Sequence, residues 1–225
     1  MPAQSPMPTP EVLIPVHAIK GRGSASSIAH RFARHVREGF DDGWGTVDEM
    51  AAQREDSDPP ATQVILEDAK SVITRNDSPD IYFDYSVNPY RGCEHGCIYC
   101  YARPTHSYLG YSPGLDFETK IIAKRNIASV LRSELASPSY RPQLLNIGSA
   151  TDCYQPAERE RLLTRQVIEV MRDTQHAFSL ITKSSAVERD VDLIAPMAPR
   201  NSISKSLLSL LRRLAVLQHC LRLRA

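Results

Sequence analysis

The sequence has almost no net charge, and it has no apolar run long enough to cross a bilayer. Its 225 residues carry 27 Lys and Arg against 26 Asp and Glu, a formal net charge of +1, which speaks against a generally basic nucleic-acid surface. The nearest approach to a membrane span, residues 203–221, has Arg212 and Arg213 in its middle. The N-terminus lacks the apolar core of a secretory signal. We therefore expect a cytoplasmic protein with no membrane span, whose thiols stay reduced.

Cysteine is also scarce, and its distribution is uneven. There are five cysteines, and three of them, Cys93, Cys97 and Cys100, fall within eight residues. Such spacing is poor for a disulfide framework and good for a metal. Structural zinc usually takes two separated ligand pairs, and no second cysteine pair is present. His95 or His106 could supply a fourth ligand, although His95 lies between two of the cysteines. A [4Fe-4S] cluster held by three thiolates, with one iron left open, is the other interpretation.

Composition divides the chain into three parts. Residues 1–60 are rich in Pro, Ser, Gly and charge, so we expect a poorly ordered extension with at most a short helix at 28–40. Apolar and β-branched runs then predict strands at 62–69, 80–87, 144–150 and 177–183. Helical periodicity predicts helices that begin near Glu118 and Ala157, and a third over 187–198, ended by Pro196 and Pro199. Alternating strands and helices predict an α/β fold with parallel βα units.

Three unusual segments follow three successive predicted strands. They are the cysteine loop, GSATDCYQPAE from Gly148, and TKSS from Thr182. In parallel α/β folds, the loops at the carboxyl ends of the strands lie along one rim. We therefore expect these segments to form one shared site.

Cys93-x-x-x-Cys97-x-x-Cys100, with aromatic Tyr99 before the last cysteine, resembles the signature of the radical S-adenosylmethionine (SAM) superfamily. The stretch from NDSPDIYF to FETKI, residues 76–121, resembles a subfamily related to the spore photoproduct lyases. TDCYQPAERE and LITKSSAVERDVDLI resemble its next two signature stretches, and GRGSASS and FDDGW resemble its N-terminal extension. The resemblance implies an incomplete radical SAM partial (βα) barrel, with the N-terminal half of the core at 61–200 and a largely disordered extension before it.

The resemblance also implies a mechanism. Cys93, Cys97 and Cys100 would ligate a [4Fe-4S] cluster whose open iron chelates the amino and carboxylate groups of SAM. An electron from a flavodoxin- or ferredoxin-like donor would cleave SAM to methionine and a 5′-deoxyadenosyl radical, which abstracts hydrogen from a substrate. Lyase or DNA-repair chemistry on a nucleic acid follows only from kinship, and the substrate stays unknown.

Further residues occupy positions that the resemblance assigns to SAM. Tyr99 would pack by the adenine, or be a core tyrosine. Gly148, Ser149 and Thr151 would meet the amino end of SAM, or form a turn with no such role. Lys183 would lie beside the SAM carboxylate, or be an ordinary solvated lysine.

The remaining candidates have weaker assignments. Asp152 could accept from the SAM amino group or cap the helix at Ala157. Cys153 is read as an incidental small apolar residue. Three flanking residues would tune the cluster, meet a substrate phosphate, or be solvated loop residues: Arg91, Arg103 and His106.

After about residue 200 the resemblance ends. Residues 201–225 contain no Asp or Glu and are dominated by Leu, Ser and Arg. Two interpretations of this basic, Leu-rich tail remain: a frame shift, or a real amphipathic helix. A barrel of three or four strands leaves an unpaired sheet edge and an uncovered apolar interior. We therefore expect a chain that is aggregation-prone and at best weakly active. A non-catalytic iron–sulfur or zinc module and a nonfunctional fragment are the rival interpretations.

Overall fold

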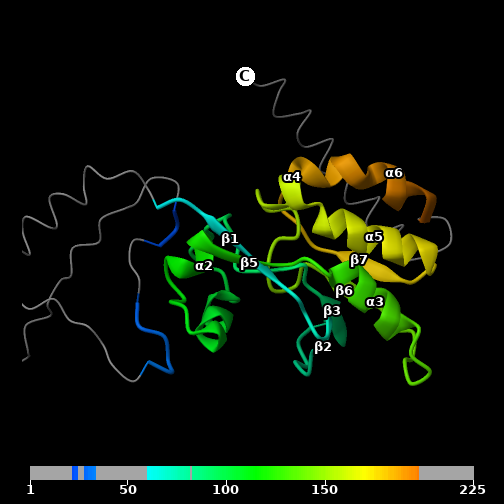
Figure 1. The fold of residues 1–225 in the computed structure, drawn as a ribbon, viewed down its shortest axis with the longest axis horizontal. Coiled ribbons are helices and arrows are strands. Elements are labelled where there is room, and N and C mark those ends of the chain that lie inside the picture. The colour runs from blue at the N-terminus through cyan, green and yellow to red at the C-terminus, as the bar shows by residue number, and fades with distance from the viewer. Residues whose placement is uncertain (1–21, 25–27, 34–59, 82, 198–225) are drawn as a thin grey trace, which may run out of the picture.

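A computed structural model of the chain describes residues 22–24, 28–33, 60–81 and 83–197 (Figure 1). Most of the expected extension, and the whole tail at 201–225 with its two interpretations, lie outside these residues. Residues 28–33 contain a turn at Arg31 and Phe32. The described part of the helix expected at 28–40 is therefore not helical.

Two small sheets carry the strands. In the first, β2 (Ile73–Arg75), β3 (Tyr85–Val87), β6 (Leu145–Ile147) and β7 (Phe178–Leu180) lie in that order. β3, β6 and β7 are parallel, whereas β2 is antiparallel to β3. In the second, β5 (Lys120–Lys124) lies between β1 (Gln63–Glu67) and β4 (Tyr90–Arg91). The described residues thus form a mixed α/β structure and no closed barrel.

The helical segments are mostly short. They are η1 (Arg103–Leu109), α2 (Asp116–Thr119), α3 (Ile127–Leu135), α4 (Glu158–Arg161), α5 (Leu163–Asp173), η2 (Ser185–Asp190), α6 (Val191–Ile194) and η3 (Ala195–Met197). Among the described residues, none of these is long and apolar enough to cross a membrane.

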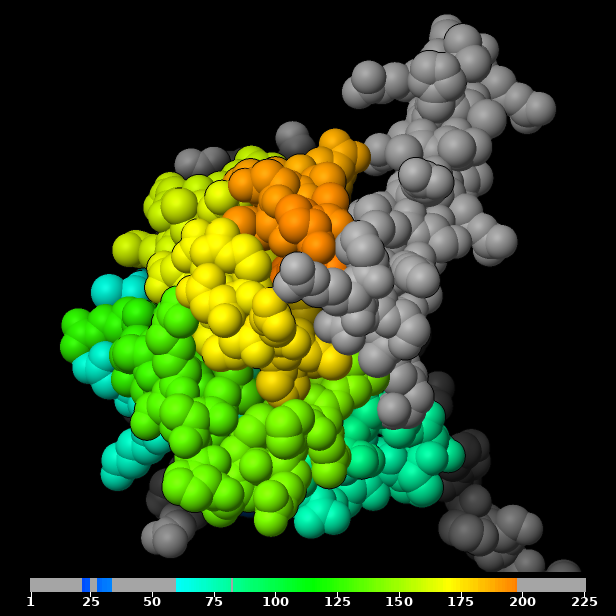
Figure 2. Space-filling view, turned by 90° about the vertical axis from the view of Figure 1, so that its right-hand side faces the viewer, coloured from blue at the N-terminus to red at the C-terminus, as the bar shows by residue number. Residues whose placement is uncertain are grey.

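The core lies between the first sheet and the helices on one of its faces. Val87, Leu145, Ile147, Phe178 and Leu180 alternate onto that face and are buried in one cluster with the apolar sides of α3 and α5. Figure 2 shows α3, α5 and α6 covering this side of the molecule. This core fixes the ends of the strands, and therefore the starting points of the loops that follow them.

The opposite face of the same strands is polar rather than apolar. Ser86, Asn146 and Ser179 are aligned across β3, β6 and β7, and the Asn146 side-chain amide donates to Ser179 Oγ at 2.8 Å. The expectation of an uncovered apolar interior is therefore wrong for these strands. β7 pairs only with β6 among the described strands and forms the edge of this sheet.

Three predicted elements differ from the structure. The helix expected from near Glu118 is present from Ile127 as α3. The residues before it form β5 instead, because Ile121, Ile122 and Ala123 are buried between β1 and β4. The helix expected from Ala157 is interrupted at Leu162, which adopts a left-handed backbone conformation with φ of 55°. The helix expected over 187–198 is three short helical segments instead.

Candidate functional site

The cysteine loop begins directly after β4 and is held at its first cysteine. Gly92 has φ of 82°, and the Cys93 N–H donates to the Phe117 carbonyl at 2.8 Å. Cys93 is buried, whereas Cys97 and Cys100 are half-buried. The Cys100 N–H closes a turn onto the Cys97 carbonyl at 3.2 Å. The thiols of Cys97 and Cys100 are thus partly accessible to a ligand, whereas Cys93 is buried and its backbone is held by Phe117.

The donor chemistry of this loop fits an iron–sulfur cluster. Thiolates are the soft ligands that iron–sulfur clusters and zinc prefer, and all three thiols are free. Burial raises the pKa of the Cys93 thiol to about 11, so a metal would have to displace its proton. The described residues contain no ready-made group of His, Cys, Asp or Glu at metal-holding geometry. A cluster would therefore require the cysteine side chains to turn toward it.

The turn after β6 packs against the cysteine loop. Gly148 has φ of 85°, and a Cβ there would lie 2.8 Å from the Ile181 carbonyl oxygen, so the chain needs glycine at this point. The next residues are fixed by Asn88, whose side chain donates to Ser149 Oγ at 3.1 Å and accepts from the Ala150 N–H at 2.9 Å. Ala150 in turn packs against the cluster of buried residues that contains Cys93.

Two further hydrogen bonds tie this turn to the rest of the site. The Tyr101 hydroxyl donates to the Ser149 carbonyl. The Thr151 hydroxyl donates to the Tyr90 carbonyl at 3.3 Å. Ser149 and Thr151 therefore lie beside the cysteine loop with their side-chain hydroxyls already engaged.

Lys183, at the end of the third parallel strand, reaches the same place. Its Nζ donates to the Tyr99 hydroxyl and lies 4.4 Å from the centre of the Tyr99 ring. Tyr99 is 73% exposed, which excludes the core interpretation of this residue. The pKa of Lys183 is raised, chiefly by this hydrogen bond and to a smaller extent by nearby acidic groups that include Asp152. The ammonium therefore lies in an electronegative setting beside the cysteines.

Asp152 joins the turn after β6 to the segment that follows β7. Its carboxylate accepts from the Thr182 hydroxyl at 2.7 Å and from the Lys183 N–H at 2.9 Å, and it lies 3.8 Å from His95 Nδ1. The three segments that the sequence places after successive strands thus meet around one carboxylate. Asp152 does not cap the helix at Ala157, so that alternative is wrong.

Two residues that the sequence analysis did not identify, Glu94 and Gln155, bind the cysteine loop to the segment before α4. Glu94 accepts from the Ala157 N–H at 3.1 Å, at the start of α4. The Gln155 amide accepts from the Glu94 N–H and donates to the Gly92 carbonyl, both at 3.1 Å. Because these partners are more than sixty residues apart, no local pattern identifies them.

The flanking candidates divide into buried and exposed residues. Arg103 donates to the Cys97 carbonyl from Nε at 3.1 Å, and only 12% of its side chain is exposed. His106 is fully buried. The solvated-loop alternative is therefore wrong for these two residues. Arg91 is partly exposed and lies 3.5 Å from Glu67. Cys153 is fully buried, and its thiol donates to the Ile181 carbonyl at 3.7 Å.

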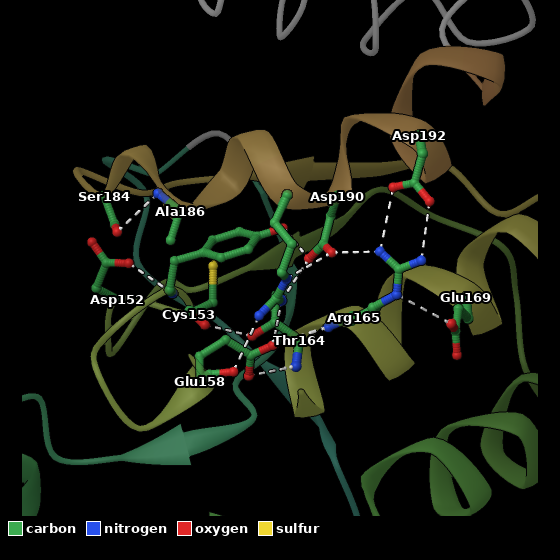
Figure 3. Close-up of polar contacts among 12 residues, drawn as sticks. Asp152, Cys153, Glu158, Thr164, Arg165, Glu169, Ser184, Ala186, Asp190 and Asp192 are labelled. Carbon is green, nitrogen blue, oxygen red and sulfur yellow. Dashed lines mark hydrogen bonds and ion pairs between the residues drawn. The ribbon is translucent and has the colours of Figure 1, made fainter. Parts of the chain in front are cut away.

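A buried ion network lies behind these loops (Figure 3). Glu158 accepts from the Tyr90 hydroxyl at 2.5 Å and from the Thr164 N–H at 2.9 Å. Asp190 accepts from Arg165 at 2.8 Å. Burial alone would raise the pKa of Asp190, but hydrogen bonds from neighbouring arginines outweigh burial and lower it. These contacts fasten α4, α5 and the segment before α6 together.

Comparison with known proteins finds relatives without an assigned activity. Uncharacterised proteins of Mycobacterium tuberculosis and Mycobacterium bovis are 44% identical over 122 residues, which cover 54% of this chain and 36% of each relative. An uncharacterised protein of Methanocaldococcus jannaschii is 29% identical over 109 residues, covering 48% of this chain and 39% of the relative. The chain thus spans little more than a third of the length of the relatives it matches. No family model and no solved structure matches.

Proposed function

We propose that this chain carries the cluster-binding half of a radical SAM enzyme of the branch related to the spore photoproduct lyases, with a [4Fe-4S] cluster and SAM as cofactors. One observation carries the proposal. Asp152, in the turn after β6, accepts from the Lys183 N–H and lies 3.8 Å from His95 of the cysteine loop, and Tyr101 and Tyr99 of that loop reach Ser149 and Lys183. A loop whose three thiols only bind a metal has no need of a lysine beside it, whereas a site that also binds SAM does.

The cysteines have the first role in this proposal. Cys93, Cys97 and Cys100 hold the cluster as thiolates, and each must lose its proton to do so. When bound, the cluster supplies the electron that cleaves SAM. Cys93 is anchored by its N–H bond to Phe117, so the partly exposed Cys97 and Cys100 are the side chains that move.

Lys183 binds the carboxylate of SAM. Its ammonium is exposed and carries full charge, and among the described residues its hydrogen-bond partner is the exposed Tyr99. Exchanging the neutral Tyr99 hydroxyl for a carboxylate adds an ion pair to the hydrogen bond and strengthens it. Tyr99 is then free to offer its ring to the adenine.

The turn after β6 borders the amino end of SAM. Gly148 lets the backbone turn sharply, and Ser149 and Thr151 continue it beside the cysteine loop. The carboxylate of Asp152 is already shared between Thr182 and Lys183. Its role is therefore to orient the third loop rather than to bind SAM directly.

The partner and the substrate follow from the reaction class. A flavodoxin- or ferredoxin-like protein supplies single electrons, and the substrate is a molecule with an abstractable hydrogen. The proposal of a nucleic-acid substrate depends on the resemblance to lesion-repairing lyases. It is an argument from the family and not from any residue of this site.

The test is formation of 5′-deoxyadenosine from SAM under reducing, anaerobic conditions after iron and sulfide are supplied. Because the chain is expected to be at best weakly active, we expect a small amount of product in the wild-type chain and none in Cys97→Ala. Lys183→Ala should raise the SAM concentration needed roughly tenfold, because a hydrogen-bonded charge is lost. Lys70→Ala removes an exposed lysine between β1 and β2 and should change nothing.

Other outcomes decide against the proposal. Product formation in Cys97→Ala would remove the cysteine loop from the reaction. A wild-type chain that binds zinc, or that binds an iron–sulfur cluster without cleaving SAM, would identify a non-catalytic metal module.

A further inference from the structure

Residues 22–24, here called the strap, lie against the middle of the cysteine loop. A Cβ on Gly23 would be 1.6 Å from the Gly96 carbonyl oxygen and 2.7 Å from its carbonyl carbon. Both are backbone atoms, which cannot swing aside as a side chain can. Only glycine therefore allows the strap to occupy this place.

The residue that the strap contacts, Gly96, is also a glycine. Its φ is +60°, in the left-handed region that favours glycine. A Cβ there would lie 2.9 Å from Glu118 Oε2 and 3.0 Å from the Gly23 nitrogen. Two glycines from distant parts of the sequence are thus packed backbone to backbone, at a point between Cys93 and Cys97.

Arg22 binds the strap to two neighbouring segments through three acceptors. Its Nη1 donates to the Glu118 carbonyl at 3.1 Å. Its Nη2 donates to the Pro60 carbonyl at 2.8 Å and to Thr62 Oγ1 at 3.1 Å. Figure 1 shows the described N-terminal pieces beside the part of the molecule formed by β1, β5 and α2.

A continuous series of polar contacts leads from the strap to a cysteine. The Gly23 N–H donates to Glu118 Oε2 at 2.9 Å. The other carboxylate oxygen pairs with Arg103. Arg103 donates to the Cys97 carbonyl from Nε at 3.1 Å and from Nη2 at 3.0 Å. The Glu118 side chain is fully buried, so removing any partner leaves a poorly compensated charge.

We propose that the strap is a positioning element for the cysteine loop, acting through Gly96 and through Glu118 and Arg103 on the Cys97 peptide. A loop with a left-handed glycine between its cysteines is free to adopt many conformations. The strap limits that freedom and holds Cys97 and Cys100 in register with Cys93. Its relevance to a cluster rests on the proposed function, whereas its effect on the loop does not.

The test uses the full chain and compares Gly23→Ala with wild type by hydrogen exchange. The Cys100 and Arg103 amides donate to carbonyls inside the loop, so their exchange reports its opening. We expect Gly23→Ala to accelerate exchange over 97–103 about tenfold, equivalent to about 1.4 kcal/mol. Exchange in α5 should be unchanged, because the strap's hydrogen bonds go to Pro60, Thr62 and Glu118.

Gly110→Ala is the matched control. Gly110 ends η1 in the same part of the molecule, with φ of +75°, and a Cβ there meets nothing within 4 Å. It adds the same methyl group and local backbone strain without displacing the strap. Equal acceleration in both variants, or none in Gly23→Ala, would overturn the proposal.

A second pair of variants separates positioning from general stability. Arg22→Gln should accelerate loop exchange, and Arg22→Lys should restore part of the protection because it keeps a donor. After reconstitution, Gly23→Ala should bind less iron and give an altered electron paramagnetic resonance spectrum. If the wild type binds no cluster, the proposed function fails, but the exchange comparison still decides the role of the strap.

Discussion

Asp190 and Asp192 offer a direct test of which charges hold the site's scaffold together. Both carboxylates bind Arg165, at 2.8 Å and 3.0 Å respectively. Asp190 has no exposed side-chain surface, whereas 59% of the Asp192 side chain is exposed. The same substitution, Asp to Asn, can therefore be made on two sides of one arginine.

The structure sets the size of the effect at Asp190. Breaking a buried ion pair on one side costs about 3–5 kcal/mol. Arg165 and Arg189 are each partly exposed, and each keeps a second carboxylate, Asp192 or Glu158. We therefore expect about 2–3 kcal/mol of destabilisation in Asp190→Asn. For a chain of this size, this lowers the melting midpoint by roughly 5–10 °C.

Thermal unfolding followed by far-ultraviolet circular dichroism measures both variants. Asp192→Asn should leave the midpoint nearly unchanged, because exposed ion pairs contribute little. If Asp192→Asn destabilises the chain as much as Asp190→Asn, burial does not determine the strength of this network, and the reasoning is refuted.

Three further outcomes follow from the structure. Cys153→Ala should keep full iron content after reconstitution while Cys97→Ala loses it, since the Cys153 thiol is fully buried; equal loss of iron in both would make Cys153 a ligand. Gly148→Ala should lower the free energy of unfolding by about 1–3 kcal/mol, measured by urea titration, because its φ is 85° and Ile181 leaves no space for a Cβ; an unchanged midpoint would contradict this. Burial lowers the pKa of Lys124 to about 8, so the unfolded chain binds more protons between about pH 8 and 10.4 and stability should rise with pH across that window relative to Lys124→Met; a constant difference between the two proteins would show that Lys124 is not desolvated.

The sequence predicted those elements whose signal is local. The strands at Leu145 and Phe178 are short apolar runs in a pattern of alternating strands and helices, and they are present and parallel. The predicted helix near Glu118 is confirmed in α3, but its first residues form β5, because a short apolar run such as 121–123 is compatible with either state. Its neighbours, β1 and β4, decide the outcome, and those pairings are not local.

The sequence predicted which segments form the site, but not the long-range contacts that hold them in place. The carboxyl-end rule places the cysteine loop, the Gly148 turn and Lys183 together, and the structure has them in contact through Tyr101 and Asp152. The strap was predicted as loose from its Gly and Ser content, yet glycine at residue 23 is what permits its close contact with Gly96. Composition does not distinguish a glycine that is flexible from one that is tightly packed.

The proposed function requires Cys93, Cys97 and Cys100 to hold a cluster with one iron open to SAM. The most direct measurement is electron paramagnetic resonance of the anaerobically reconstituted, reduced chain, recorded with and without SAM beside its iron and sulfide content. We expect about four iron atoms per chain, a spectrum that changes when SAM is added, and loss of both in the triple alanine variant. A spectrum indifferent to SAM, or iron retained without the three cysteines, would contradict it.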